Sequence, residues 1–494
     1  MIDRVVVHRG RHRDSVSLML ASREAGAAEG VEEVSAVSAT PINLELLRRS
    51  GFAFEEAAEP RPGDMVIAIR ARDDDAVEAA IAAFESALAA STPERKGALP
   101  PAPTITAAAR RSRDANLAVV SVPGPAAASE CAAALAAELN VFCFSSGFDH
   151  ATERELKRMA LERDLLMMGP DCGTAILGGV GIGFSNAVQP GPVGIVGASG
   201  TGMQQVSCLL DAAGVGISHA IGVGGRDLEA PIGGAMALRA IELLAADEQT
   251  RVIVVIAKSP DESVAAAVAE RLAAASKPAV VCFPGFRGEL AEVAAAETLE
   301  DAARMAAGEA GAALPAEEDS PPPSRTGLVR GLFCGGTLRD EAAAVLADIL
   351  PEAPALLSRE SEPGEERNTL VDYGSEELTL GRPHPMIDPS LRDAGVEREG
   401  RDERVAVLLA DVVLGRGSHP DPASGLAAAL ERARAARSDP PAAVVSLCGA
   451  AGDEQGLEEG AAKLREAGAV VVRSNAAAAR LAGGVVADAA EVHG

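Results

Sequence analysis

The chain has 494 residues, of which 48% are hydrophobic and only 2% are aromatic. At about 100–200 residues per domain, this length predicts several domains. The net charge of −27 argues against non-specific binding to nucleic acid or to an anionic membrane surface. The scarcity of aromatic side chains argues against a surface on which bases stack.

The sequence also bears on compartment and on metals. No run approaches 18 consecutive apolar residues, and the start, Met1–Arg4, leads into no cleavable apolar segment, so we expect a cytoplasmic protein without a spanning helix. Seven cysteines are dispersed and form no CxxC pair, which favours small buried hydrophobes in a reducing compartment. We therefore expect no metal site.

Two polar, proline-rich stretches, Ser91–Pro103 and Leu314–Arg325, are typical of linkers. A further division is expected near Gln189–Pro192. Together they predict four domains, at residues 1–95, 104–188, 189–313 and 326–494.

The first block predicts a small α/β module in which we find no reactive constellation of side chains. Apolar runs of strand type alternate in it with amphipathic runs of helix type. The expected strands are Val5–His8, Val34–Val37 and Met65–Ile69, and the expected helices are Ser15–Glu24 and Ala76–Leu88.

From residue 117 to 283, continuously apolar strands alternate with Ala-rich helices, which predicts a parallel sheet covered on both faces. Ligands of such sheets bind beyond the carboxyl ends of the strands. The expected strands are Leu117–Val122, Val141–Phe144, Leu165–Met168, Val193–Val196, Ile217–Val223, Val252–Ile256 and Ala279–Phe283.

The last block repeats this pattern. Its expected strands are Leu328–Phe333, Val405–Leu409, Ala443–Leu447 and Val470–Val472. The charged, Pro/Gly-rich stretch from Glu352 to Arg404 is expected to be a long excursion from the sheet, either functional or disordered.

The strongest chemical signal is the loop GASGTG, which closes the strand ending at Val196. Its glycines let backbone approach an anion, and the following helix start directs free N–H groups at it. We expect Ser199, Gly200, Thr201 and Gly202 to bind phosphate or carboxylate. The alternative is a tight turn that needs glycine only for its geometry.

Other strand ends carry similar loops. Gly224, Gly225 and Arg226 are expected to bind substrate and Asp227 to act catalytically, against the alternative of a solvated Arg–Asp pair. Further small-residue loops, with Gly173 beside Cys172 and with Gly336 and Thr337, are expected to contact substrate, while Cys172 itself is expected to be inert.

The last block also holds two proline-rich turns with imidazoles and carboxylates. His384 and Asp388 occupy one turn, and Asp411, His419 and Asp421 follow the next strand. These residue types permit proton transfer, a metal site or simple loop packing. Because prolines flank the imidazoles, helical metal spacing is disfavoured, and we expect His384 to be a catalytic residue.

From Asn116 to about Ala303 the chain resembles the α subunit of succinyl-CoA synthetase and related NDP-forming acyl-CoA synthetases. The ordered motifs are VVSVPGPAAASECAAAL, VFCFSSGFDHATERELKRMA, GPDCGTAI, GPVGIVGASGTGMQQV and GISHAIGVGGRDL. Over its whole length it resembles the FdrA branch through DSVSLMLASR, GLFCGGTL, GRPHPMIDPSLR and LLADVVLGRG. The resemblance implies a doubly wound α/β architecture: the small N-terminal module, a CoA-binding-like Rossmann domain and two flavodoxin-like ligase domains.

The chain departs from the synthetase pattern at two places. Pro284–Gly288 stands where the synthetases carry their phosphohistidine loop, and no His lies between residues 220 and 383. The loop that binds the CoA phosphate in the synthetases has no counterpart, because the first block and its linker stand in its place. Phosphoryl relay through histidine is therefore not expected.

The FdrA resemblance implies a subunit of a carbamoyltransferase that acts on carbamoyl phosphate and a small acid or amide such as oxamate, in allantoin breakdown. It implies partner subunits in a hetero-oligomer and no required cofactor, with nucleotide or CoA binding left open. The alternatives are an NDP-forming acyl-CoA ligase and a non-catalytic scaffold subunit.

Overall fold

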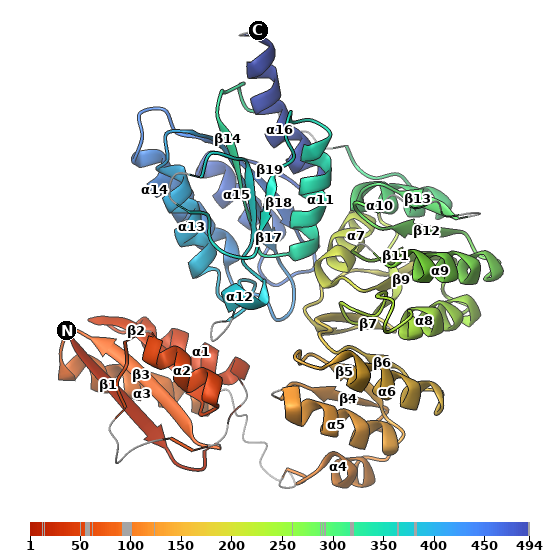
Figure 1. Cartoon of the computed structure of the whole chain (residues 1–494), viewed down its shortest axis with the longest axis horizontal. Helices are drawn as coiled ribbons and strands as arrows, with labels where there is room; N and C mark the ends of the chain where they lie inside the picture. The colour runs from red at the N-terminus through yellow and green to blue at the C-terminus, as the bar shows by residue number, and fades with distance from the viewer. Residues whose placement is uncertain are drawn as a thin grey trace. The chain divides into compact units, whose positions relative to one another are not determined.

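The computed structural model describes residues 1–11, 13, 15–49, 51–54, 60–61, 63–90, 101–122, 124–258, 260–286, 288, 290, 293–316, 321–362, 365–379 and 383–492. The chain divides into two compact units, one formed by residues 1–102 and the other by residues 103–379 with 384–494. Figure 1 shows the elements of both units along the chain.

The first unit is a three-stranded antiparallel sheet with helices. Its central strand is almost wholly buried because the sheet order is β1-β3-β2. Helices α1 and α3 pack against each other and close its core. The predicted small α/β module is thus confirmed, with β1 (Ile2–His8), α1 (Ser15–Gly26), β2 (Val31–Ser38), α2 (Pro41–Arg49), β3 (Met65–Ala71) and α3 (Asp74–Ala90).

The second unit begins with a short parallel sheet of order β4-β5-β6. Its strands are apolar, as the sequence predicts. The strands are β4 (Leu117–Val120), β5 (Asn140–Cys143) and β6 (Met167–Met168), and the helices are α4 (Ile105–Arg111), α5 (Gly124–Ala136) and α6 (His150–Leu161).

A seven-stranded sheet follows, in the order β13-β12-β11-β9-β10-β7-β8. Its centre is parallel, whereas the hairpin β7–β8 pairs antiparallel with β10. The elements are β7 (Thr174–Leu177), β8 (Val180–Gly183), β9 (Pro190–Gly197), α7 (Gly200–Ala212), β10 (Ile217–Gly222), α8 (Ala235–Ala246), β11 (Val252–Ile256), α9 (Glu262–Ala274), β12 (Ala279–Cys282), β13 (Ala294–Ala296) and α10 (Leu299–Glu309). By strand pairing this sheet therefore starts at Thr174, before the predicted boundary between residues 188 and 189.

The third sheet of this unit is wholly parallel, in the order β15-β16-β14-β17-β18-β19. Its strands are β14 (Leu328–Phe333), β15 (Ala355–Leu357), β16 (Thr369–Asp372), β17 (Val405–Val413), β18 (Ala442–Cys448) and β19 (Ala469–Val472). Its helices are α11 (Gly336–Ala347), α12 (Glu376–Thr379), α13 (Ser390–Gly400), α14 (Pro422–Ala435), α15 (Leu457–Glu466) and α16 (Asn475–Val492). These sheets confirm the predicted fold class, several parallel-sheet α/β domains.

One prediction about this sheet is wrong. The stretch from Glu352 to Arg404 is not an excursion, because β15 and β16 extend the sheet on the far side of β14. Both strands are short, so their apolar runs are hidden among the charged residues and glycines that surround them.

The last two sheets are joined through helices that pack between them. Helix α7 lies against α10 and also against α11 (Figure 1). Buried polar contacts tie the same layers: Asn186 Nδ2 donates to Leu414 O at 3.0 Å and to Asp453 Oδ2 at 2.7 Å. The two domains therefore form one packed body.

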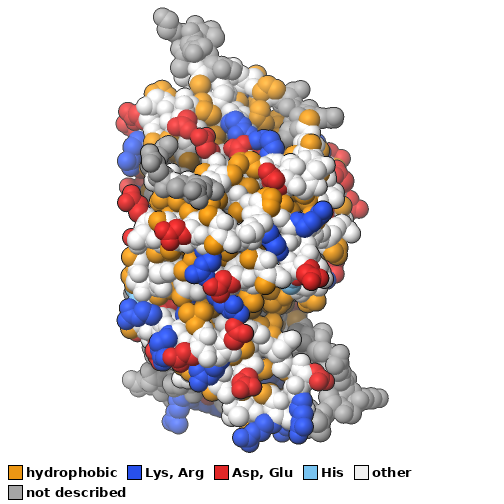
Figure 2. All heavy atoms as spheres, turned by 90° about the vertical axis from the view of Figure 1, so that its right-hand side faces the viewer, with side chains coloured by type: hydrophobic (Ala, Val, Ile, Leu, Met, Phe, Trp, Pro, Cys, Tyr) orange, Lys and Arg blue, Asp and Glu red, His pale blue; other side chains and the backbone are white. Residues whose placement is uncertain are grey.

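The surface and the helices agree with the composition. Acidic and basic side chains are interspersed over the face shown in Figure 2. Within the described part of the chain, no helix combines the length and the apolarity needed to cross a membrane.

Candidate functional site

The N-terminus of α7 is built from the glycine-rich loop that closes β9. Ser199 is the N-cap, with extended backbone, and its Oγ accepts a hydrogen bond from the Gly202 N–H at 3.0 Å. A Cβ at Gly202 would lie 2.5 Å from that Oγ, so the cap needs glycine there. The remaining N–H groups of the first turn have no partner inside the helix and carry its positive dipole end.

A second helix start meets the first. The Ser199 hydroxyl donates to Thr337 Oγ1 at 2.7 Å, and Thr337 lies in the first turn of α11. A Cβ at Gly335 would come within 2.8 Å of Thr201 Oγ1, so the close approach also requires glycine. The structure thus brings together the predicted residues Ser199, Thr201 and Thr337 from two different domains.

A buried carboxylate holds the loop before α11. Asp411 lies in β17, and its two oxygens accept from the N–H groups of Cys334 at 2.6 Å and Gly335 at 2.9 Å. Burial raises the pKa of Asp411 to about 6, and the nearby Arg392 guanidinium opposes that rise. Asp411 therefore positions the start of α11.

A lysine and a carboxylate lie beside the start of α11. A Cβ at Gly336 would be 2.4 Å from Asp372 Oδ2 and 2.7 Å from Lys258 Nζ. Lys258 Nζ is 3.4 Å from Asp340 Oδ2 and its side chain is 46% exposed, so it remains accessible to a ligand. Burial raises the pKa of Asp372, and the Lys258 charge opposes this. A bound anion would be attracted by Lys258 and repelled by Asp372.

His384 lies close to the same region. A Cβ at Gly374 would be 2.6 Å from its Nε2, and its Nδ1 accepts from the Met386 N–H at 3.2 Å. Burial lowers the pKa of His384 to about 4, so the ring is neutral near pH 7. With Nδ1 accepting, the ring proton is assigned to Nε2, so His384, for which a catalytic role is predicted, is suited to donate a hydrogen bond.

The loop before β7 forms another part of the site. A Cβ at Gly200 would approach Thr174 Oγ1 to 3.1 Å, so Gly173 and Thr174 adjoin the start of α7. Burial raises the pKa of the Cys172 thiol to about 12, and its Sγ donates to Thr174 O at 3.6 Å. The thiol stays protonated, which agrees with the expectation that it is inert.

Asp171 precedes this thiol and has a perturbed acidity. Its side chain is exposed, yet the surrounding protein displaces enough water to raise its pKa to about 6. The charge of Glu376 adds to the rise, and Lys258 and Arg226 oppose it. A carboxylate with such a pKa is suited to accept a proton near neutral pH.

Asp227 and Arg226 each pair with a buried side chain of opposite charge. Asp227 is fully buried, accepts from Lys157 Nζ at 2.7 Å and from the Ala237 N–H at 2.8 Å, and so holds the start of α8. Arg226 donates to Glu153 Oε2 at 2.8 Å. The Asp227 side chain is directed inward because Lys157 supplies a buried opposite charge, whereas the Arg226 side chain is 33% exposed and its charge acts on Asp171.

The two glycines of that loop have different surroundings. Gly224 has φ +89°, and a Cβ there would lie 2.4 Å from Pro170 O, so this glycine allows two loops to pack closely. A Cβ at Gly225 would be 3.4 Å from Asp171 Oδ2, which is ordinary contact. Gly225 thus adjoins the exposed carboxylate, whereas Gly224 is explained by packing.

The sequence interpretation missed three residues of this site: Asp171, Lys258 and Asp372. Each follows or ends a strand at the carboxyl edge of a parallel sheet, as β11 precedes Lys258 and β16 ends at Asp372. That position was the available signal. It was overlooked because Lys258 and Asp372 lie outside the glycine-rich motifs, and because the loop that holds Asp171 was interpreted from Cys172 and Gly173 alone.

Comparison with known proteins places these domains. Residues 1–102 match the family described as "AllF, heavy metal-associated domain", residues 188–285 the "CoA binding domain" and residues 332–485 the "CoA-ligase" family. The CoA-binding match falls on the domain predicted as ligase-like, not on residues 104–188.

Relatives were also found over long stretches. The chain is 36% identical over 500 residues to "Uncharacterized protein YahF" of Escherichia coli (strain K12), covering 96% of both chains. It is 30% identical to subunit alpha-2 of a mitochondrial succinate–CoA ligase of Trichomonas vaginalis, over 35% of this chain and 57% of that protein. A solved structure, dinucleotide-forming acetyl-coenzyme A synthetase 1 of Ca. Korarchaeum cryptofilum with phosphate and ADP, aligns with TM-score 0.35 and 16% identity over 81% of this chain and 87% of that one.

The name of the first family suggests metal, and the residues present do not fit one. The first 102 residues contain no cysteine. Across the described residues, no group of three or more His, Cys, Asp or Glu side chains is placed to share an ion. We therefore derive no metal chemistry for the N-terminal module.

Proposed function

We propose that this chain, which belongs to the same family as YahF of Escherichia coli, is the phosphate-holding subunit of a carbamoyltransferase that uses carbamoyl phosphate. One observation carries the proposal: the helix starts of α7 and α11 meet, with Ser199 Oγ 2.7 Å from Thr337 Oγ1. Two helix N-termini that lie next to each other place two positive dipole ends together, which favours a phosphate group beside them.

The chemistry follows from this arrangement. Carbamoyl phosphate is a mixed anhydride, and an amide nitrogen of the acceptor, such as oxamate, attacks its carbonyl carbon. A new C–N bond forms, the bond between carbon and the phosphate oxygen breaks, and phosphate leaves with the electron pair. The N–H groups of the helix starts and the Lys258 ammonium stabilise that departing charge.

The proton of the attacking nitrogen needs an acceptor. Among the side chains of this site, Asp171 has an exposed carboxyl whose pKa is raised to about 6. His384 has its Nδ1 engaged by the Met386 N–H. We therefore assign the base to Asp171, or to a group from a partner subunit, and assign to His384 a hydrogen bond from Nε2.

A phosphohistidine is not part of this proposal. The sequence has no His between residues 220 and 383, and the turn after β12 begins with Pro284 and Gly285. His384 is held neutral by burial, which lowers its pKa to about 4, and by its bond to Met386. Direct transfer needs no mobile imidazole, so neither nucleotide nor CoA is required.

The second candidate is an acyl-CoA ligase. It is favoured by the CoA-ligase and CoA-binding matches and by the succinate–CoA ligase relatives. This alternative requires a nucleoside triphosphate and a phosphorylated enzyme. Incubation of the chain with γ-labelled ATP and magnesium distinguishes the ligase from the carbamoyltransferase, because acid-labile label on a histidine supports the ligase.

The decisive assay measures phosphate release from carbamoyl phosphate plus oxamate. We expect the purified chain alone to be weakly active or inactive and to gain activity with the products of neighbouring genes. Thr337→Val in the active mixture should lower the rate, while the distant surface variant Arg432→Gln should not. Absence of acceptor-dependent phosphate release in every mixture would contradict the carbamoyltransferase proposal.

A further inference from the structure

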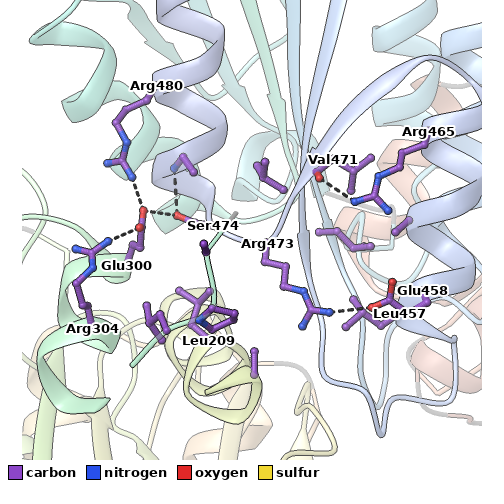
Figure 3. A pocket seen from close by; sticks show the side chains of 18 residues that line it. Leu209, Glu300, Arg304, Leu457, Glu458, Arg465, Val471, Arg473, Ser474 and Arg480 are labelled. Atoms are coloured by element: carbon purple, nitrogen blue, oxygen red, sulfur yellow. Dashed lines mark hydrogen bonds and ion pairs between the residues drawn. The ribbon is translucent and has the colours of Figure 1, made fainter. Parts of the chain in front are cut away.

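A cavity lies between the last two domains of the second unit, separate from the site at the starts of α7 and α11. Its volume is about 690 Å³, a size typical of small-molecule sites. Figure 3 shows side chains from α10 and α7 on one side and from β19, α15 and α16 on the other. The lining residues are Leu209, Ala212, Glu300, Arg304, Leu314, Pro315, Ala316, Leu447, Leu457, Glu458, Ala461, Arg465, Val471, Val472, Arg473, Ser474, Ala477 and Arg480.

The charge of this cavity is opposite to that of the protein. Four arginines and two glutamates line it, so the lining carries a net charge of +2, whereas the whole chain carries −27. The N-terminus of α16 adds a positive dipole end, since the lining residue Ser474 caps it by accepting the Ala477 N–H at 3.1 Å. A concentration of cationic groups in an acidic chain is unexpected unless it attracts an anion.

Three of the four lining guanidinium groups are held by the lining glutamates, and the fourth, of Arg465, donates to Val471 O at 3.3 Å. Glu300 accepts from both Arg304 and Arg480, and from Ser474 Oγ at 2.8 Å. Arg473 Nη2 donates to Glu458 at 2.8 Å (Figure 3). Arg304 also pairs with Asp301, so the glutamates and this aspartate fix the positions of the guanidinium groups, each of which carries five N–H donors.

We propose that this cavity binds a small organic anion carrying two or more carboxylate or phosphate groups. Guanidinium groups match both oxyanions in a bidentate manner, and the lining leucines and valines accommodate a carbon skeleton. The lining contains no aromatic side chain and no histidine on which a nucleobase could stack. The ligand is therefore a non-aromatic polyanion.

This cavity is distinct from the phosphate site. Leu209 and Ala212, from the last turns of α7, line it, whereas Ser199 caps the first turn of the same helix. At about 1.5 Å per residue, a helix of 13 residues separates the two ends by about 20 Å. The two sites can therefore be tested independently.

The test is calorimetric titration of the full chain with citrate and with inorganic pyrophosphate, at constant ionic strength. We expect at least one of them to bind, and Arg473→Gln to weaken that binding about tenfold. Arg473 is 39% exposed, so its replacement should leave the fold intact, as an unchanged circular dichroism spectrum would show. Arg432, which is 53% exposed and pairs with Glu397 elsewhere, supplies the matched control Arg432→Gln.

The outcomes separate the possibilities. Binding of citrate alone identifies a polycarboxylate, and binding of pyrophosphate alone an organic phosphate. Ser199→Ala should leave this affinity unchanged, so failure of the phosphate-site proposal would not affect the result. Absence of binding of both probes at millimolar concentration, or equal affinity of the Arg473→Gln and wild-type proteins, would overturn the proposal.

Discussion

The contact between the two helix starts makes a quantitative prediction. Ser199→Ala removes a hydroxyl that accepts from the Gly202 N–H and donates to Thr337 Oγ1. Loss of an N-cap costs about 1 kcal/mol. Leaving the buried Thr337 hydroxyl without its donor costs about 1 kcal/mol more. Local opening of both helix starts should therefore become roughly 30-fold more frequent.

Native-state hydrogen exchange read by mass spectrometry can measure this opening in peptides that cover the starts of α7 and α11. Thr337→Val keeps the α7 cap and should raise exchange only about fivefold, an effect of about 1 kcal/mol. The double variant should fall short of the sum by about 1 kcal/mol, because each single change disrupts the same bond.

A matched control is available in the same unit. Thr298 caps α10 by accepting the Asp301 N–H at 3.0 Å. Thr298→Ala should speed exchange in α10 and leave the α7 and α11 peptides unchanged. If Ser199→Ala affects only the α7 peptide, or if the double variant is additive, the two helix starts do not depend on each other and the reasoning about a shared phosphate site fails.

Three further predictions concern charge and thiols. Burial lowers the pKa of His384 from 6.5 to about 4. The neutral buried ring therefore contributes to the free energy of unfolding above pH 6.5, and this contribution, at most about 3 kcal/mol, is lost as the pH falls toward 4. His384→Asn should therefore flatten the pH dependence of the urea midpoint between pH 4.5 and 7; an unchanged slope would show that the ring is not buried in solution. Asp372→Asn removes a negative charge near the start of α11 and should tighten phosphate binding roughly three- to tenfold by calorimetry, whereas weaker binding would place the anion elsewhere. All seven cysteines are free and buried. A thiol reagent should therefore react only slowly with the native chain, and it should label seven thiols once the chain is denatured. Rapid labelling of the native chain would contradict this burial.

Much of the fold could be predicted from local patterns. The runs Val252–Ile256 and Leu328–Phe333 form strands with the predicted bounds, because buried parallel strands are continuously apolar. Short strands were harder to predict. Strands β15 and β16 have three and four residues, and an apolar run that short cannot be distinguished from the charged residues around it.

The candidate site was predicted only in part. The loop before α7 was found because glycine and serine at a strand end are a local signature of a capped helix start. The inward orientation of Asp227 could not be found, because its partner Lys157 lies 70 positions earlier in the chain. A charged residue beside a glycine loop has the same local appearance whether it faces a ligand or a buried opposite charge.

The sequence by itself determined the alternation of strands and helices, the class of sheet and the glycine loops, since each depends on residues within one turn or one strand. Only the tertiary structure decided that Ser199 meets Thr337, and that arginines from α10, α15, α16 and the turn after β19 surround one cavity. Those arrangements depend on how separate sheets pack. Packing is set by many contacts between residues far apart in the chain, and such contacts leave no periodic trace in the sequence.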